Sequence, residues 1–163
     1  QCLAAAIRES DSFSVGLTRV RPCPLEKDLR IYGNALEIEL LFINILKNAH
    51  EALMHKRDRK CDPASVDVEM THDDETVTIS ISDNGPPVSD DAFARLQSIS
   101  ESVKPEGLGL GLAIVRNIVD EHGANLTIQR LEPCGLRVSV TFALADGRKQ
   151  SNAPTDPPRG DAT

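Results

Sequence analysis

The fold of this chain is decided by the stretch Glu39-Leu40-Leu41-Phe42-Ile43-Asn44-Ile45-Leu46-Lys47-Asn48-Ala49-His50-Glu51-Ala52-Leu53. It contains no Gly or Pro, and its apolar residues recur every three or four positions. This spacing predicts one long buried helix from about Asn34 to about Lys56. Asn44 and Asn48 are four residues apart and therefore share one side of it. Two amides there are costly unless polar groups meet them, whereas two asparagines on an ordinary helix more often face water.

Alternation and turn residues predict further elements on both sides of this helix. The β-hairpin that follows it is the clearest, because two strictly alternating segments flank Asp73-Asp74. The predicted elements are a short helix in residues 1–9, strands 13–17 and 28–32, the long helix, strands 66–70 and 77–82, a short helix after Ser89 carrying Phe93 and Leu96, a polar loop 98–105, a helix from Gly107–Gly111 to His122-Gly123, and strands 126–131 and 136–144.

About four helices and six strands with hairpins at both ends favour a two-layer α/β sandwich, in which one mixed β-sheet is covered on one face by helices. The other face of the sheet is expected to be solvated. Its predicted residues are Asp67, Glu69, Thr78, Ser80 and Ser139. Residues 1–145 are expected to form one domain. Residues 146–163 hold three of the 10 prolines and almost no apolar residue, which predicts a disordered tail.

The composition excludes several classes of function. The chain has 163 residues and a formal net charge of −7, which gives no footprint for nucleic acid or for direct contact with an anionic membrane surface. Cys2, Cys23, Cys61 and Cys134 are scattered, which favours reduced thiols in a cytoplasmic setting over structural zinc. No long apolar run is present, and the chain starts at Gln1, so we expect a fragment whose parent carries any membrane anchor elsewhere.

Asp83-Asn84-Gly85 follows a predicted buried strand. A carboxylate there can accept a hydrogen bond from an exocyclic amino group, and Gly85 would let a flat ring approach the backbone. Adenine would fit this description. A turn without any ligand is the commoner explanation for this triplet alone.

The glycine run Gly107-Leu108-Gly109-Leu110-Gly111-Leu112 opens a predicted helix. Backbone N–H groups at a helix N-terminus favour anions, so phosphate is the expected ligand. Alone, the run is equally consistent with a flexible hinge that packs closely on a neighbour. It is not a P-loop, because no Gly-Lys-Ser/Thr follows, and no strand precedes it as in a Rossmann fingerprint.

Together the three elements fit one ligand. Asp83 would hold the base, the glycine run would hold the phosphates, and the Asn48 amide oxygen would ligate a Mg²⁺ that bridges them, since Mg²⁺ commonly takes only one or two ligands from protein. Lys104 could neutralise the terminal phosphate. A solvated loop lysine is an equally good interpretation of Lys104.

The order of these motifs resembles the N, G1, F and G2 boxes of the sensor histidine kinase catalytic domain. The matching residues are Asn44-x-x-x-Asn48-Ala49, Asp83-x-Gly85, the Phe93 helix, Gly107-x-Gly109-x-Gly111-Leu112 and His122-Gly123. That family shares its ATP-binding (Bergerat) fold with type II topoisomerases, mismatch-repair ATPases and anti-sigma serine kinases. The chain looks closest to the kinases, because Asn44 stands where the ATPases carry a water-activating Glu.

The resemblance implies ATP and Mg²⁺ as ligands, with Asn48 on the metal, Asn44 on a phosphate and Asp83 with Gly85 on the adenine. Gly107, Gly109 and Gly111 would hold the phosphates at the hinge of an ATP lid spanning residues 86–106. Such domains transfer the γ-phosphoryl group of ATP to a His on a separate helical dimerisation domain, and the family's further partner is a response regulator.

The chain departs from the family pattern at Pro87, where a Gly is usual, and in residues 96–103, which lack aromatics. A family Thr near the base has no clear counterpart, although Ser139 or Thr141 could serve. None of its four histidines heads a second helix, and His50 is expected on a helix surface, so we expect no autophosphorylation by this chain alone. A degenerate pseudokinase that acts as an interaction module, and a serine kinase or ATPase of the same fold, remain alternatives.

Overall fold

The computed structural model describes residues 18–20, 29–54, 63–100 and 110–145. Within these residues the strands are β1 (Thr18–Val20), β2 (Val66–His72), β3 (Thr76–Asp83), β4 (Asn125–Arg130) and β5 (Leu136–Ala143), and the helices are α2 (Ala35–Met54), α3 (Asp90–Ser100) and α4 (Leu110–Glu121). The predictions for residues 1–9, 13–17 and 146–163 lie outside the described residues.

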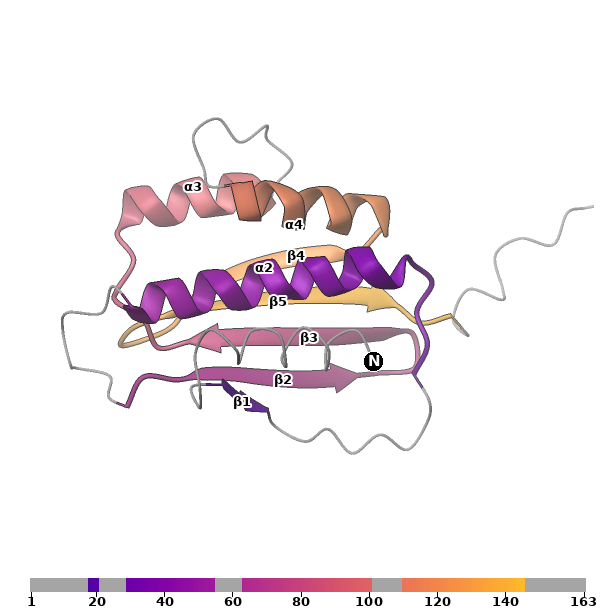
Figure 1. The fold of residues 1–163 in the computed structure, drawn as a ribbon, viewed down its shortest axis with the longest axis horizontal. Helices are drawn as coiled ribbons and strands as arrows, with labels where there is room; N and C mark the ends of the chain where they lie inside the picture. Colours follow the sequence, from indigo (N-terminus) through magenta and orange to yellow (C-terminus); the bar gives the residue numbers. More distant parts are fainter. Residues whose placement is uncertain (1–17, 21–28, 55–62, 101–109, 146–163) are drawn as a thin grey trace, which may run out of the picture.

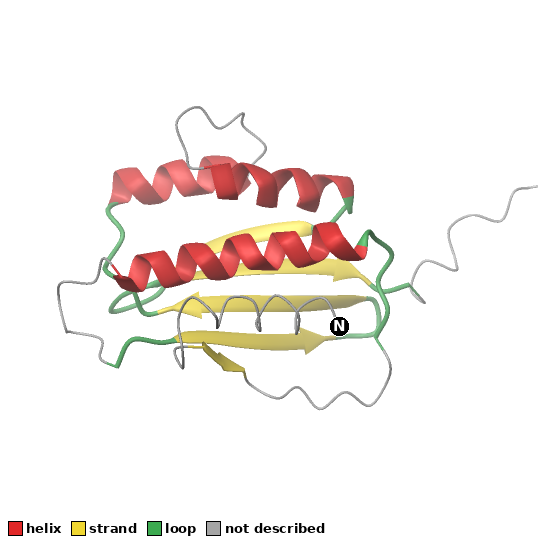
Figure 2. Cartoon of the chain, viewed as in Figure 1, coloured by secondary structure: helices red, strands yellow, loops and turns green. Residues whose placement is uncertain are grey.

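The strands form one mixed sheet in the order β1-β2-β3-β5-β4. β1 is parallel to β2, and every other pair is antiparallel. The helices α2, α3 and α4 lie together along one side of the sheet (Figure 1, Figure 2). The predicted two-layer α/β sandwich is therefore confirmed for the described residues.

The hydrophobic core lies between α2, α4 and the inner face of the sheet. α2 presents Leu41 and Leu46, which are fully buried, and the Phe42 ring meets the Phe142 ring of β5 at a centroid distance of 6.4 Å. β3 alternates strictly between buried and half-buried residues, and Asp83 continues the buried set that Val77 begins. Because side chains alternate along a strand, Asp83 points to the same face as the core.

The start of α2 follows from its cap. Asn34 Oδ1 accepts the Leu36 N–H at 3.0 Å, and the Asn34 side-chain amide donates to Glu37 Oε1 at 2.9 Å. This is a variant of the capping box, in which the residue three positions on reaches back to the cap. Leu40 was predicted in the apolar face of this helix but is 43% exposed.

The end of α4 is a Schellman motif. Gly123 has a φ of 58°, its N–H donates to the Asp120 carbonyl at 3.1 Å, and the Ala124 N–H donates to the Val119 carbonyl at 2.9 Å. The predicted stop at His122-Gly123 is thus confirmed, and the chain turns directly into β4.

Three local predictions were wrong. In the described part of the predicted strand 28–32, Ile31 makes only an isolated bridge to Leu144, while the strand at Thr18–Val20 was not predicted. Residues 98–100 belong to α3 instead of the expected loop. Cys134 is disulfide-bonded, against the expectation of reduced thiols, and the other three cysteines lie outside the described residues.

The outer face of the sheet is less solvated than expected. Ser139 is buried, and its hydroxyl pairs with that of Ser80 at 2.9 Å, while the Thr78 and Thr141 hydroxyls pair at 2.8 Å. These cross-strand pairs satisfy the polar groups within the sheet itself, so water is not needed at each of them.

Candidate functional site

Asp83 is the buried carboxylate at the end of β3. It is 8% exposed, and its Oδ1 accepts the Gly85 N–H at 2.8 Å. A Cβ on Gly85 would come within 2.7 Å of that oxygen and 3.1 Å of the Ala52 Cβ on α2. Glycine is therefore required at position 85 because the chain passes between the carboxylate and α2.

The backbone of Asp83 is fixed from the other side by the turn between β4 and β5. Gly135 in that turn has a φ of 96°, and a Cβ there would lie 1.9 Å from the Asp83 carbonyl oxygen. Sequence reasoning missed this contact, although a Gly after Pro133-Cys134 is a turn signal.

Asn84, the residue after β3, is hydrogen-bonded to the segment that precedes β2. Its Oδ1 accepts the Ser65 N–H at 2.8 Å, its Nδ2 donates to the Pro63 carbonyl at 2.7 Å, and its own N–H donates to the Ser65 carbonyl at 3.2 Å. The main chain at Asp83 is therefore held by the β4–β5 turn on one side and by the segment before β2 on the other.

The amides of Asn44 and Asn48 face the first turn of α4. The Asn44 Nδ2 donates to the Leu40 carbonyl at 2.8 Å. A Cβ on Gly111 would lie 3.1 Å from Asn44 Oδ1 and 3.5 Å from Asn48 Oδ1. The two amide oxygens and the N-terminus of α4 thus lie side by side, as the proposed phosphate end of the site requires.

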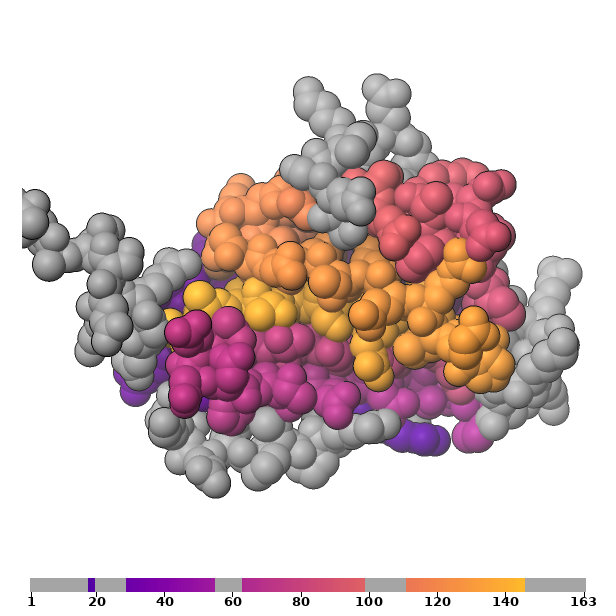
Figure 3. All heavy atoms as spheres, turned by 180° about the vertical axis from the view of Figure 1, so that it is seen from behind, coloured from indigo at the N-terminus to yellow at the C-terminus, as the bar shows by residue number. Residues whose placement is uncertain are grey.

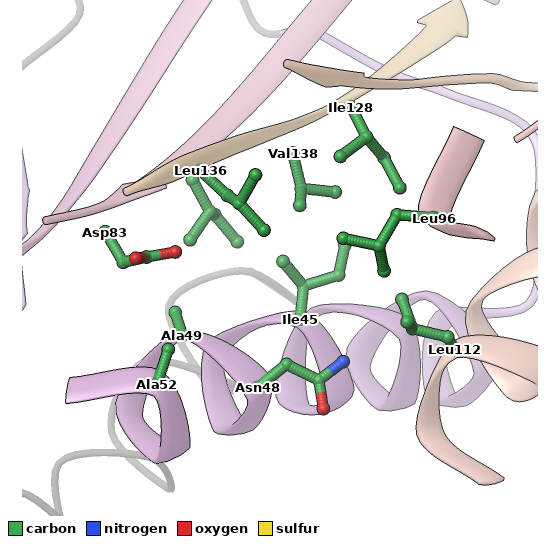
Figure 4. A pocket seen from close by; sticks show the side chains of 11 residues that line it. Ile45, Asn48, Ala49, Ala52, Asp83, Leu96, Leu112, Ile128, Leu136 and Val138 are labelled. Carbon is green, nitrogen blue, oxygen red and sulfur yellow. The ribbon is translucent and has the colours of Figure 1, made fainter. Parts of the chain in front are cut away.

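A cavity of about 100 Å³ joins these parts. Asp83 lies at one end and Asn48 on the α2 side, and the wall between them is aliphatic (Figure 4). Its lining residues are Ile45, Asn48, Ala49, Ala52, Ile81, Asp83, Leu96, Leu112, Ile128, Leu136 and Val138. Pockets for drug-sized ligands span roughly 300–1,000 Å³, so this cavity is smaller than a site that encloses a whole nucleotide.

The structure brings most of the predicted site residues to this cavity or its rim. They are Asp83, Gly85, Asn44, Asn48, Gly111 and Leu112. Leu110 begins α4, but its side chain is not described, and Lys104, Gly107, Leu108 and Gly109 lie outside the described residues. The long helix, the Asp83 triplet and the glycine run therefore meet as expected, with Gly111 as the described glycine of that run, and the individual roles stay predictions.

Two other site predictions were wrong. Ser139 and Thr141 pair with Ser80 and Thr78 on the outer face of the sheet, and neither lines the cavity. Leu136 and Val138 of β5 line it instead. His50 is also not a surface residue, because it is 5% exposed and its Nε2 lies 3.1 Å from the Thr18 hydroxyl of β1.

The residues present fit a Mg²⁺ ion that takes one ligand from protein. Within the described residues the Asn48 amide has no protein hydrogen-bond partner, and no group of three His, Cys, Asp or Glu side chains could hold a metal by itself. A hard cation could therefore take the Asn48 oxygen and complete its shell with phosphate and water oxygens.

Comparisons with known proteins agree with this geometry. A family model described as "Histidine kinase-, DNA gyrase B-, and HSP90-like ATPase" matches residues 33–146. Sporulation kinase B of Bacillus subtilis (strain 168) is 28% identical over 142 residues, which are 85% of this chain and 32% of that protein. The C4-dicarboxylate transport sensor protein DctB of Rhizobium meliloti (strain 1021) is 31% identical over 117 residues, which are 72% of this chain and 18% of that protein.

Solved structures with the same fold include a mycobacterial sensor histidine kinase, MprB. It has a TM-score of 0.65 and 18% identity, covering 88% of this chain and 93% of that chain. The catalytic domain of histidine kinase ThkA has a TM-score of 0.60 and 22% identity, covering 86% and 92%. The chain spans no more than about a third of the two curated relatives described above.

Among the described helices, none is both long and apolar enough to cross a lipid bilayer. The family model extends over more than half of the chain and includes α2, the Asp83-Asn84-Gly85 segment and α4. The chain therefore belongs to the family of histidine kinase-, DNA gyrase B- and HSP90-like ATPases.

Proposed function

We propose that this chain is the ATP-binding catalytic domain of a two-component sensor histidine kinase. It would bind Mg-ATP and donate the γ-phosphoryl group to a His on a separate dimerisation domain of the parent kinase, from which a response regulator would receive it. The observation that carries the proposal is that Asp83 and Asn48 line one cavity and that Gly111 lies against the Asn48 amide.

At the Asp83 end of the cavity, the Asp83 carboxylate would accept a hydrogen bond from the exocyclic amino group of adenine. The aliphatic wall supports this role, because it offers a flat ring dispersion contacts and excludes water from the polar pair. Gly85 would keep the carboxylate in place through its N–H, which donates to Oδ1 at 2.8 Å.

At the Asn48 side, Asn48 would ligate Mg²⁺ and Asn44 would contact a phosphate, next to the N-terminus of α4. Gly107, Gly109 and Gly111, with the intervening Leu108 and Leu110 and the following Leu112, would form the phosphate cradle, and Lys104 would neutralise the terminal phosphate. Positioning and charge neutralisation are the main means by which proteins catalyse phosphoryl transfer.

The first test is nucleotide binding by the 163-residue chain. We expect ATP and ADP with Mg²⁺ to raise the melting temperature, since a ligand at a hundred times its dissociation constant stabilises a protein by about 2.7 kcal/mol. No shift at millimolar nucleotide would instead favour an interaction module that has lost the ligand.

Asp83→Asn tests the base end. Replacing the carboxylate by an amide should weaken ATP binding by about 10- to 100-fold, which is the effect of losing a hydrogen bond to a charged group. Isothermal titration calorimetry measures the affinity. Asp74→Asn, at an exposed turn position, removes the same charge and should bind like the wild type. Equal affinities for both variants would refute the role of Asp83.

Asn48→Ala tests the metal end. The variant should bind nucleotide with little dependence on Mg²⁺, whereas the wild type should bind much more tightly with the ion than without it. Asn117→Ala, an exposed change on α4, is the matched control. Identical titrations of the Asn48 variant and the wild type, with and without Mg²⁺, would contradict the assignment. If nucleotide binds, adding a helical histidine domain in trans tests phosphoryl transfer.

A further inference from the structure

Helix α3 is joined to the edge of the sheet by Arg130, the last residue of β4. The Arg130 Nη2 donates to Asp90 Oδ1 at 2.7 Å, and the Arg130 guanidinium carbon lies 4.5 Å from the centroid of the Phe93 ring. Asp90 and Phe93 are three residues apart at the start of α3, so one guanidinium contacts both on the same side of the helix.

The position of α3 determines one wall of the candidate nucleotide cavity. Leu96 lies one turn beyond Phe93 and lines the cavity together with Asp83 and Asn48 (Figure 4). From behind, α3 adjoins the β4 end of the sheet (Figure 3). A shift of α3 away from β4 would withdraw Leu96 and open the aliphatic wall to water.

We propose that Arg130 is a positioning residue for nucleotide binding. By holding Asp90 and Phe93 against β4, it keeps Leu96 in the wall of the cavity, where the base of a nucleotide would pack. The proposal rests on the proposed function, because it assigns Arg130 a part in forming the same site. Arg130 itself does not line the cavity, and the proposal does not require it to contact the nucleotide.

Neither contact of Arg130 is strong alone. The Asp90 side chain is 92% exposed and that of Arg130 is 33% exposed, so water screens the ion pair. A guanidinium over an aromatic face adds a second, comparable attraction. Since both act on the first turn of α3, losing Arg130 should affect this helix and leave the core of the sheet intact.

The experiment compares Arg130→Ala, Arg130→Lys and Arg95→Gln in the 163-residue chain. Arg95 is exposed on the same helix, and Arg95→Gln removes one positive charge without changing the contacts of Arg130. The hydrogen-exchange rate of the α3 amides in the nucleotide-free protein reports how firmly Arg130 holds α3 against β4. The dissociation constant and the release rate of Mg-ATP report its consequence for binding.

In Arg130→Ala we expect the α3 amides to exchange about tenfold faster and Mg-ATP to bind about tenfold more weakly, mainly through faster release. Arg130→Lys should give intermediate values, because it keeps the ion pair and weakens the stacking on Phe93. Arg95→Gln should match the wild type. Intermediate behaviour of the lysine variant separates positioning by these contacts from a general loss of folding.

Unchanged α3 exchange in Arg130→Ala would overturn the proposal, and so would faster exchange with unchanged nucleotide binding. If the wild type itself binds no nucleotide, the proposed function fails and the role of Arg130 in binding fails with it. The exchange data are obtained without nucleotide, so they show in that case whether the contact holding α3 was real, and the two failures are distinguished.

Discussion

The two ends of the candidate cavity are built in different ways. At the Asp83 end the main chain is packed from two sides: Gly85 lies against Ala52, and Gly135 lies against the Asp83 carbonyl. At the Gly111 end, two side-chain amides of α2 meet the first turn of α4, and the Asn48 amide has no protein hydrogen-bond partner within the described residues. The Asp83 end is closely packed by main chain, and the Gly111 end offers polar groups that a ligand could use.

This difference matches the two parts of the proposed ligand. A flat base gains most from a rigid, preformed slot, because little ordering is then needed on binding. A metal ion with its phosphates needs oxygen ligands and backbone donors that the protein does not already use. Substitutions of the closely packed glycines at the Asp83 end should therefore affect stability first, and substitutions at the Gly111 end should affect binding first.

The largest effect is expected for Gly135→Ala. The new Cβ would lie 1.9 Å from the Asp83 carbonyl oxygen, and the φ of 96° is itself unfavourable for alanine. Overpacking and backbone strain should together lower the free energy of unfolding by about 2–4 kcal/mol. Urea denaturation of the purified variant measures it. A variant as stable as the wild type would mean that the β4–β5 turn does not fix the main chain at Asp83.

His122→Ala should be the next largest, and it acts on the far end of α4. The His122 ring is 5% exposed; its Nδ1–H donates to the Ile118 carbonyl at 2.8 Å, and its Nε2 accepts the Asn34 N–H at 3.1 Å. Losing both bonds should lower the free energy of unfolding by about 1–3 kcal/mol. Thermal unfolding against His72→Ala, a change at an exposed histidine, measures the difference, and equal melting points would exclude this tie between α2 and α4.

Gly111→Ala should separate binding from stability. Position 111 is helical, which favours alanine by up to about 1 kcal/mol, but the new Cβ would lie 3.1 Å from Asn44 Oδ1 and that side chain would have to shift slightly. Because the two effects oppose each other, the free energy of unfolding should change by less than about 1 kcal/mol. The Cβ would nevertheless lie 3.1 Å from Asn44 Oδ1 and 3.5 Å from Asn48 Oδ1, next to the proposed ligand groups, and Mg-ATP affinity should fall about tenfold by calorimetry. A loss of stability like that of Gly135→Ala would contradict the distinction between the two ends.

Sequence patterns predicted the parts of this fold that depend on local periodicity. The long helix, the hairpin of β2 and β3, and the stop after His122 follow from spacing and turn residues, and the structure has them. Asp83, Asn48 and Gly111 could be grouped because one ligand explained all three. Their actual proximity depends on how α2 crosses the sheet, which no local pattern states.

What could not be predicted depends on contacts between remote residues. His50 is buried because β1, a three-residue strand, pairs with β2 beside it, and a strand that short has almost no periodicity to detect. Arg130 contacts Asp90, which is 40 residues away in the chain, and also Phe93. Gly135, in the turn between β4 and β5, contacts the Asp83 carbonyl. Both require the register of β4 and β5, which only the folded sheet provides.

The smallest effect is expected at the β2–β3 turn, far from both ends of the cavity. The Asp73 carboxylate accepts the Glu75 N–H at 2.8 Å and the Thr76 N–H at 2.7 Å. These backbone hydrogen bonds lower the pKa of Asp73 below its ordinary value of 3.8, and the bond from Glu75 has the largest effect. Because the folded-state pKa lies below that of the unfolded chain, the carboxylate stabilises the fold above pH 3.8 and loses this effect as the pH falls through the folded-state pKa.

Asp73→Asn should therefore flatten the pH dependence of stability in the acid range. The wild type should lose its advantage over the variant as the pH falls below 3.8, while the two should differ by a constant amount near neutrality. Urea denaturation between neutral and acid pH measures both curves. Mg-ATP affinity should be the same for both proteins at neutral pH, because this turn is remote from the cavity, and a weaker affinity of the variant would show that the two regions are coupled.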